Sequence, residues 1–167
     1  MYAAVDVGYP PGGGARAALV LSDSPEFARL TDTRVSTLDD VAPYEPGQFY
    51  KRELPAVRAV LTELTELPRL LVVDGFVDLD PEGTPGLGRY VHREFGFTVV
   101  GVAKTAFRTA KHALEVHRGA SSRPLYVTSA GMPPEDAAAL VKKLSGPHRI
   151  PFALKAVDRL SRGLTQF

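Results

Sequence analysis

Two short, continuous apolar runs restrict the fold of this chain more than any other feature of the sequence. Residues 69–74 read Arg-Leu-Leu-Val-Val-Asp, and residues 98–103 read Thr-Val-Val-Gly-Val-Ala. Runs of this length without polar alternation are typical of strands that are buried on both faces of a sheet. A Gly- and Pro-rich loop at 75–86 and an expected helix over 87–94 separate the two runs. This alternation of strand and helix predicts that the two strands pair in parallel.

The N-terminal part of the chain predicts an antiparallel start to the same sheet. Apolar runs at 2–9 and 15–21 flank the turn-forming string Pro10-Pro-Gly-Gly-Gly14, which is the pattern of two strands joined by a tight turn. A third strand is expected over residues 27–35. A phosphate-binding loop is the alternative reading of the glycines, but no Gly-Lys-Ser/Thr follows them, so a hairpin turn suffices.

The remaining segments complete the expected order of elements. Residues 41–50 contain too many prolines and glycines for the interior of an element and predict a loop. From Arg52 to Leu64 apolar residues recur at helical spacing and predict a helix, with Pro55 tolerated in its first turn. Downstream we expect a hairpin of residues 111–118 and 123–128, a helix over 133–144, and an amphipathic segment, 153–160, packed on the sheet. Antiparallel strands followed by alternating helices and parallel strands predict an α/β fold, a ribonuclease-H-like mixed sheet flanked by helices, in a single domain spanning 1–167.

The composition excludes several classes of site. The chain has no cysteine, which rules out disulfides and thiolate zinc sites. Its four histidines show no metal-like spacing, so zinc is not expected. No apolar run approaches the ~20 residues of a membrane span, and we expect a cytoplasmic protein without a membrane partner. The net charge of +1 argues neither for nor against nucleic acid, because a binding face needs only a local basic patch.

Three carboxylates stand at positions that suit a metal. Asp6 lies inside an apolar strand, where an unpaired charge is costly, and Asp74 ends another such strand. Glu53 lies in the first turn of the expected helix. Each also fits a structural role alone: Asp74 precedes Gly75 and could cap a turn, and the helix dipole favours Glu53. Together they could hold the two Mg²⁺ ions, roughly 4 Å apart, that cut a phosphodiester.

Four strings of the sequence become specific when they are taken together and in order. They are Val5-Asp-Val-Gly-Tyr9, Pro43-Tyr-Glu-Pro-Gly47 leading to Tyr50-Lys-Arg-Glu-Leu-Pro55, Val72-Val-Asp-Gly75, and Gly101-Val-Ala-Lys-Thr105. In this order they resemble the motifs of the endonuclease V family. The similarity continues through Pro124-Leu-Tyr-Val-Thr-Ser-Ala-Gly131, Arg149-Ile-Pro151 and Val157-Asp-Arg-Leu-Ser161.

The resemblance implies a magnesium-dependent endonuclease, with Mn²⁺ as a possible substitute, that acts in DNA repair or RNA turnover. Such an enzyme recognises deaminated adenine, as inosine in DNA or RNA, and nicks the strand on its 3′ side. The resemblance also implies that Asp6, Glu53 and Asp74 hold the metal and that Lys104 lies beside the scissile phosphate. An ammonium at a strand end next to carboxylates can stabilise charge on phosphate, although Lys104 alone could be an ordinary surface lysine.

The same resemblance assigns the residues that contact the base. Tyr44 corresponds to the family's wedge, an aromatic group that fills the gap left when the base is turned out of the stack. Gly47 and Gly75 would line the base pocket, because a missing side chain lets backbone groups reach the base edge. The expected partner is a nucleic acid that contains inosine or another deaminated base, bound by a monomer.

The segment after Asp74 departs from the family pattern. Where the family commonly has a histidine-proline-arginine string, this chain has Asp80 and Glu82 at the positions of the histidine and the arginine. Met132 likewise stands where the family tends to have histidine. We expect the carboxylates of Asp78, Asp80 and Glu82 to repel phosphate, or Asp80 to serve as an extra metal ligand.

Basic residues elsewhere could contact phosphates or could simply be solvated charges. They are Arg108, Lys111, His117, Arg118, Arg123, Lys142, Lys143, His148 and Arg149. The alternative function is therefore a catalytically silent or retargeted nucleic-acid-binding relative of endonuclease V. Magnesium-dependent nicking is the observation that separates this alternative from the enzyme.

Overall fold

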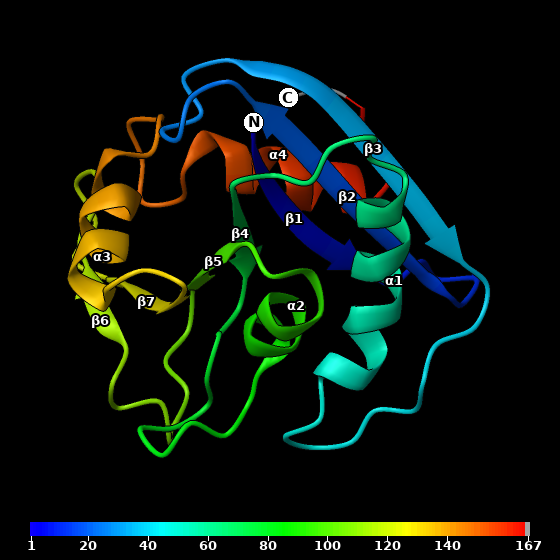
Figure 1. The fold of residues 1–167 in the computed structure, drawn as a ribbon, viewed down its shortest axis with the longest axis horizontal. Coiled ribbons are helices and arrows are strands. Elements are labelled where there is room, and N and C mark those ends of the chain that lie inside the picture. The colour runs from blue at the N-terminus through cyan, green and yellow to red at the C-terminus, as the bar shows by residue number, and fades with distance from the viewer. Residues whose placement is uncertain (166–167) are drawn as a thin grey trace.

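A seven-stranded mixed sheet forms the centre of the computed structural model, which describes residues 1–165 (Figure 1). The strands are β1 (Tyr2–Gly8), β2 (Ala15–Ser22), β3 (Leu30–Leu38), β4 (Leu70–Asp74), β5 (Thr98–Ala103), β6 (Leu114–Val116) and β7 (Leu125–Ala130). They lie in the order β3-β2-β1-β4-β5-β7-β6. β1 pairs antiparallel with β2 and parallel with β4, so the first three strands form the antiparallel start that the sequence predicts.

The third strand begins three residues later than expected, at Leu30 instead of Phe27. Ser22 and Ser24 stabilise a turn before it: the Ser22 hydroxyl donates to the Arg29 carbonyl oxygen, and the Ser24 hydroxyl accepts from the Ala28 N–H. Phe27 itself has a left-handed backbone, with φ of 56°, and its side chain is fully buried. The apolar residue that suggested a strand therefore packs into the core from a turn.

The second half of the sheet is only partly parallel. β4 and β5 pair in parallel, as predicted, but β7 pairs antiparallel with both β5 and β6. The expected hairpin of β6 and β7 is confirmed. Because the chain returns to β5 through this hairpin rather than through a helical crossover, β7 runs opposite to β5, whereas β6 runs in the same direction as β5.

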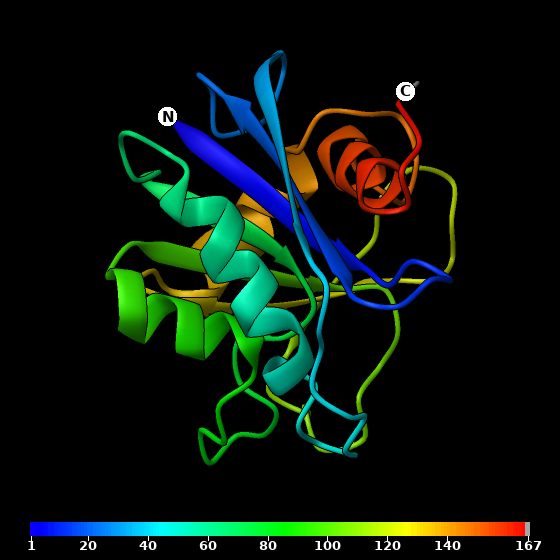
Figure 2. The same cartoon turned by 90° about the vertical axis from the view of Figure 1, so that its right-hand side faces the viewer.

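Two helices cover each face of the sheet (Figure 2). The helices are α1 (Tyr50–Thr62) and α2 (Leu87–Phe95) on one face, and α3 (Pro134–Lys143) and α4 (Phe152–Ser161) on the other. Alternate strand residues supply the two cores: Ala3 and Val5 pack in the α1/α2 core, whereas Ala4 packs in the α3/α4 core. The amphipathic C-terminal segment thus packs on the sheet as predicted. None of the helices within residues 1–165 is long and apolar enough to cross a membrane.

Candidate active site

Three elements bring Asp6, Glu53 and Asp74 to one edge of the sheet, and we call these three residues the acid centre. Asp6 lies near the end of β1 and Asp74 ends β4, the parallel neighbour of β1. Strand alternation places Asp6 on the same face as Ala4 and Asp74 on the same face as Val72, which is the face that α3 and α4 cover. Glu53 approaches from the first turn of α1.

The carboxyl groups of the acid centre share one electrostatic environment. Burial, and then the charge of Asp74, raises the pKa of Asp6 to about 7. Burial, and then the charges of Asp6 and Asp74, raises the pKa of Glu53 to about 8. Desolvation and like charges both disfavour the ionised carboxylate. In the absence of a cation, Asp6 and Glu53 therefore take up protons near neutral pH.

Lys104 supplies a positive charge beside the acid centre. It follows β5, and its Nζ donates to Oδ2 of Asp74 at 2.7 Å. Burial alone would lower the pKa of Lys104, but the charge of Asp74, its hydrogen bond and the charge of Asp6 together raise it. The guanidinium of Arg149 donates to the backbone carbonyl of Lys104 and helps to fix this end of β5. The predicted proximity of Lys104 to the carboxylates is thus observed, although its predicted role toward phosphate stays a prediction.

Asp158 is a fourth carboxylate near the acid centre, and no role was assigned to it from the sequence. It lies on α4, and its charge raises the pKa of both Asp6 and Lys104. α4 packs so closely on the end of β1 that a Cβ on Gly8 would collide with the carbonyl oxygen of Ser161. Asp158 belongs to the string Val157-Asp-Arg-Leu-Ser161, but nothing in its spacing connects it to Asp6, because only the packing of α4 brings them together.

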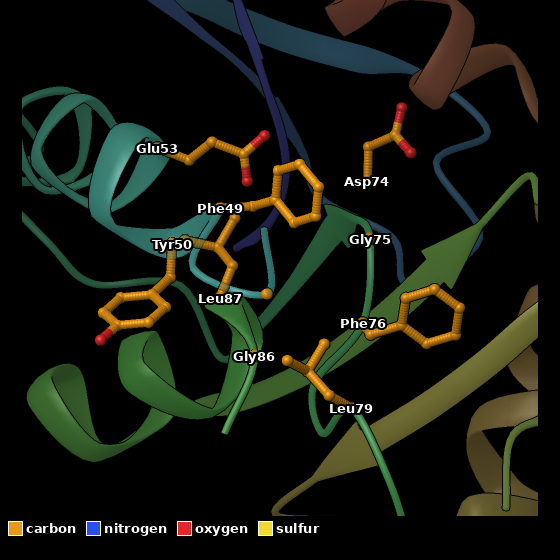
Figure 3. Close-up of a pocket in the computed structure, with 10 residues that line it drawn as sticks. Phe49, Tyr50, Glu53, Asp74, Gly75, Phe76, Leu79, Gly86 and Leu87 are labelled. Carbon is orange, nitrogen blue, oxygen red and sulfur yellow. The ribbon is translucent and has the colours of Figure 1, made fainter. Parts of the chain in front are cut away.

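A cavity of about 180 Å³ opens beside Glu53 and Asp74 (Figure 3). Gly47 and Gly75, the two predicted pocket glycines, both line it. Each has a positive φ, 75° for Gly47 and 141° for Gly75, a conformation that side chains disfavour. The other lining residues are mostly apolar or aromatic: Phe49, Tyr50, Phe76, Leu79, Gly86 and Leu87. The cavity is small and flanked by rings and backbone, which suits one flat group.

Thr128 fixes the wall of this cavity from a neighbouring strand. Its buried hydroxyl oxygen accepts a hydrogen bond from the Val77 N–H at 2.9 Å. This contact joins β7 to the loop that follows Asp74, so it holds Gly75 and Phe76 in place. No local pattern predicts this contact, because the two partners are 51 residues apart.

Tyr44 lies next to the cavity rather than inside it. The residue is 58% exposed, and its ring makes an edge-to-face contact with Phe49 at 5.3 Å between centroids. Phe49 in turn lines the cavity. An exposed aromatic ring at this position is compatible with the predicted wedge, which stays a prediction.

The sequence predicts three free carboxylates in residues 78–82, which we call the acidic loop, but two of them have hydrogen-bond partners. Asp78 makes two hydrogen bonds with the guanidinium of Arg89 on α2, at 2.9 and 2.7 Å, so its charge is compensated. Asp80 accepts a hydrogen bond from the Thr84 N–H at 2.9 Å, and hydrogen bonds from the side chain and backbone of Thr84 lower its pKa. Asp80 and Glu82 line a separate hollow with Arg108 and Lys111. The structure therefore places Asp80 away from the base cavity, and its role as an extra ligand stays a prediction.

One of the basic residues considered for phosphate contact is structural instead. Arg118 is 5% exposed, and its guanidinium donates to five backbone carbonyls. These belong to Val141, Lys142, Leu144, Gly146 and Arg149. The C-terminal carbonyls of a helix lack intrahelical partners, so Arg118 satisfies the end of α3. It cannot contact phosphate from this position.

The donor set of the acid centre fits a hard divalent cation, because it consists of carboxylate oxygens. Within residues 1–165, no three or more histidine or acidic side chains are gathered tightly enough to enclose a metal by themselves. Mg²⁺ commonly takes only one or two carboxylates and completes its shell with water and substrate phosphates. A divalent cation at the acid centre would therefore need ligands from water or substrate as well.

Comparison with known proteins identifies the relatives of this chain. The family model described as Endonuclease V matches residues 1–130. Endonuclease V of Azotobacter vinelandii is 37% identical over 120 residues, which cover 71% of this chain and 53% of that protein. Endonuclease V of Thermococcus kodakarensis is 32% identical over 164 residues, which cover 98% of this chain and 79% of that protein. The match thus spans about half the length of the first relative and about four-fifths of the second.

A solved structure of Ciona intestinalis endonuclease V shares the fold. It is a complex with a 23mer DNA that contains an inosine followed by a ribo-adenosine. Its TM-score with this chain is 0.83 at 18% identity, over 97% of this chain and 83% of that one. At this level of identity the likeness concerns the fold, and it confirms the predicted ribonuclease-H-like sheet.

Proposed function

Because this chain belongs to the endonuclease V family, we propose that it is an endonuclease that nicks a nucleic acid strand on the 3′ side of a deaminated base, read as inosine. The observation that carries the proposal is the acid centre itself. Burial and neighbouring carboxylates raise the pKa of Asp6 and Glu53 at this sheet edge, between a lysine and a small glycine-lined cavity. The inosine-containing DNA in the Ciona complex supports the choice of base.

Asp6, Glu53 and Asp74 are the residues that would hold Mg²⁺, or Mn²⁺ in its place. Bound there, the metal would activate the attacking water and offset the charge on the leaving oxygen. Asp158, which α4 brings near Asp6, is a fourth carboxylate close to the site, but its charge is paired with Arg162, so we do not count it among the metal ligands. Burial, and then neighbouring negative charge, raises the pKa values of Asp6 and Glu53, and a bound cation would favour their ionised forms.

Lys104 stabilises the phosphate that is cut. Its ammonium is held at the sheet edge by the Asp74 carboxylate, within reach of any phosphate that approaches the acid centre. A positive charge fixed in advance, in a partly dehydrated site, stabilises the charge that develops on phosphate oxygens. Lys104 therefore acts as a catalytic residue, with Asp74 as its anchor before substrate binds.

The cavity beside Glu53 receives the base. Tyr44 enters the stack as the base leaves it, which limits the cost of unstacking. The backbone at Gly47 and Gly75 reaches the base edge, while the Phe49 and Leu87 side chains pack on the ring and exclude water. The cavity then places the strand so that a bond on the 3′ side of the base lies over the acid centre.

A nicking assay tests the proposal. We expect 5′-labelled inosine strands of DNA or RNA to be cut on the 3′ side in Mg²⁺, whereas matched adenine strands, or reactions with a chelator, give no product. Asp74→Asn should remove the activity, and Asp136→Asn, the same change at an exposed position on α3, should keep it. Tight binding of inosine strands without any nicking would instead support the silent or retargeted relative.

A further inference from the structure

A second hollow, of about 440 Å³, lies on the α4 side of the acid centre. Its lining consists of Lys104, His148, Arg149, Ile150, Lys155 and Asp158. The base cavity, by contrast, is lined from α1 and α2. The Lys104–Asp74 ion pair joins the two, because Asp74 lines the base cavity and Lys104 lines the hollow. The two recesses therefore lie on opposite sides of the sheet edge that carries the acid centre.

The chemistry of the hollow is that of an anion site. His148 and Lys155 are both exposed, and within residues 1–165 neither side chain forms an ion pair or a hydrogen bond. Arg149 is committed to the structure, since it donates to the carbonyls of Lys104, Arg123 and Pro124. The negative charge of Asp158 is offset by its ion pair with Arg162. His148 and Lys155 are thus the donors that remain for a ligand.

We propose that this hollow binds the first backbone phosphate beyond the cut bond on its 3′ side, the one that joins the first and second nucleosides after the cut, with Lys155 as the main contact and His148 as a second. The inference rests on the proposed function, which puts the base in the first cavity and the cut bond at the acid centre. A strand that passes over the sheet edge from the α1/α2 side then arrives at the α4 side. An ammonium is a suitable partner for a phosphate there, because a charge-assisted hydrogen bond is stronger than a neutral one.

Substrate length provides the test. We would use inosine strands that end at the nucleoside just 3′ of the cut bond, and strands that are longer by two nucleotides at that end. Binding is measured by fluorescence anisotropy with Ca²⁺ in place of Mg²⁺, so that the readout is equilibrium affinity and not cleavage. The proteins are the wild type, Lys155→Ala, and Arg69→Ala as a control that removes one exposed cation just before β4, at the opposite end of that strand from Asp74.

The expected result is a difference in how each protein responds to length. The wild type and Arg69→Ala should bind the longer strand about tenfold more tightly, the effect of one charged hydrogen bond. Lys155→Ala should lose most of this gain, and its salt dependence on the longer strand should fall by about 0.7 in slope. An undiminished gain in Lys155→Ala, or a gain that follows 5′ extension instead, overturns the proposal.

The same strands separate this inference from the proposed function. If the wild type nicks the longer strand in Mg²⁺ but the length effect is the same in all three proteins, the hollow has no such role and the endonuclease stands. If the length effect depends on Lys155 but no nicking occurs, the hollow binds phosphate in a protein that is not an endonuclease.

Discussion

The acid centre and the acidic loop each hold three carboxylates, yet the structure treats their charges in opposite ways. In the acid centre, burial and mutual repulsion raise the pKa of Asp6 to about 7 and of Glu53 to about 8. In the acidic loop, Asp78 shares two hydrogen bonds with Arg89, and hydrogen bonds from Thr84 lower the pKa of Asp80. The two regions have the same number of acidic residues, so it is the hydrogen-bond and ion-pair partners of each carboxylate that decide whether its charge can attract a cation.

The largest effect is expected from removing a carboxylate of the acid centre. Asp6→Ala should reduce the nicking rate by roughly 10³-fold or more. Without the bound metal, the charge of the transition state is less stabilised, and the activation barrier rises by several kcal/mol. Without metal, its melting temperature should equal or exceed that of the wild type, because one source of repulsion is gone. Nicking rates and thermal melts in chelator check both statements. A large drop in melting temperature would show that Asp6 is instead a partner in the folded core.

The next largest effect is expected in how the stability of the folded protein depends on pH, which should differ between the acid centre and the acidic loop. Asp6 and Glu53 have pKa values of about 7 and 8 when folded, against 3.8 and 4.5 ordinarily. Between these limits the folded protein holds more protons than the unfolded chain, so its stability falls as pH rises. The stabilisation is complete below pH about 4 and lost by about 8, at up to roughly 1.4 kcal/mol per pH unit for each group.

Urea unfolding in chelator from pH 5 to 8 measures this slope, and Glu53→Gln should flatten it. The lowered pKa of Asp80 in the acidic loop has the opposite sign, because its contribution is lost only as pH falls into the acid range. A wild-type profile that does not change across this window contradicts the assignment of protons to Asp6 and Glu53.

A smaller effect is expected in the acidic loop, where Arg89 compensates the charge of Asp78. Asp78→Ala should destabilise the protein by about 1–3 kcal/mol, because it leaves the partly buried Arg89 without its partner. The Asp23–Arg29 pair is the matched control: both side chains are largely exposed, at 59% and 71%, so Asp23→Ala should cost at most about 1 kcal/mol. Urea midpoints for the two variants should therefore differ, and equal midpoints would mean that Asp78 is not held as described.

The smallest effect should come from Asp80. Asp80→His is expected to change the affinity for inosine strands by no more than about threefold, because the carboxylate already faces Arg108 and Lys111. Magnesium-dependent nicking should persist. Loss of nicking would identify Asp80 as a metal ligand, whereas a large gain in affinity would show that it repels the substrate.

Local patterns in the sequence were sufficient for most of the sheet. Continuous apolar runs identified β4 and β5, and alternation along β1 accounts for the face on which Asp6 lies. The start of β3 was missed because Phe27 is apolar but has a left-handed backbone. Strand propensity cannot distinguish a buried turn residue from a strand residue.

Contacts between distant segments were beyond sequence reasoning. Arg118 looked like a surface cation, but the carbonyls that bind it lie 23 to 31 residues away. Asp158 joined the site only because α4 packs against the end of β1. The compensation of Asp78 by Arg89 likewise depends on how α2 lies over the loop. In each case the local string is ordinary, and the partner is chosen by packing.

Lys104 and a bound divalent cation would compete for the carboxylate of Asp74, because Lys104 already forms an ion pair with it. A divalent cation that binds the Asp74 carboxylate would release Lys104 to bind a phosphate. A phosphate that binds Lys104 would in turn free the Asp74 carboxylate for the cation. Their binding should then be mutually cooperative, and by thermodynamic reciprocity each raises the affinity of the other by the same factor. A protein that is free of nucleic acid would hold its metal weakly and would acquire it together with its substrate.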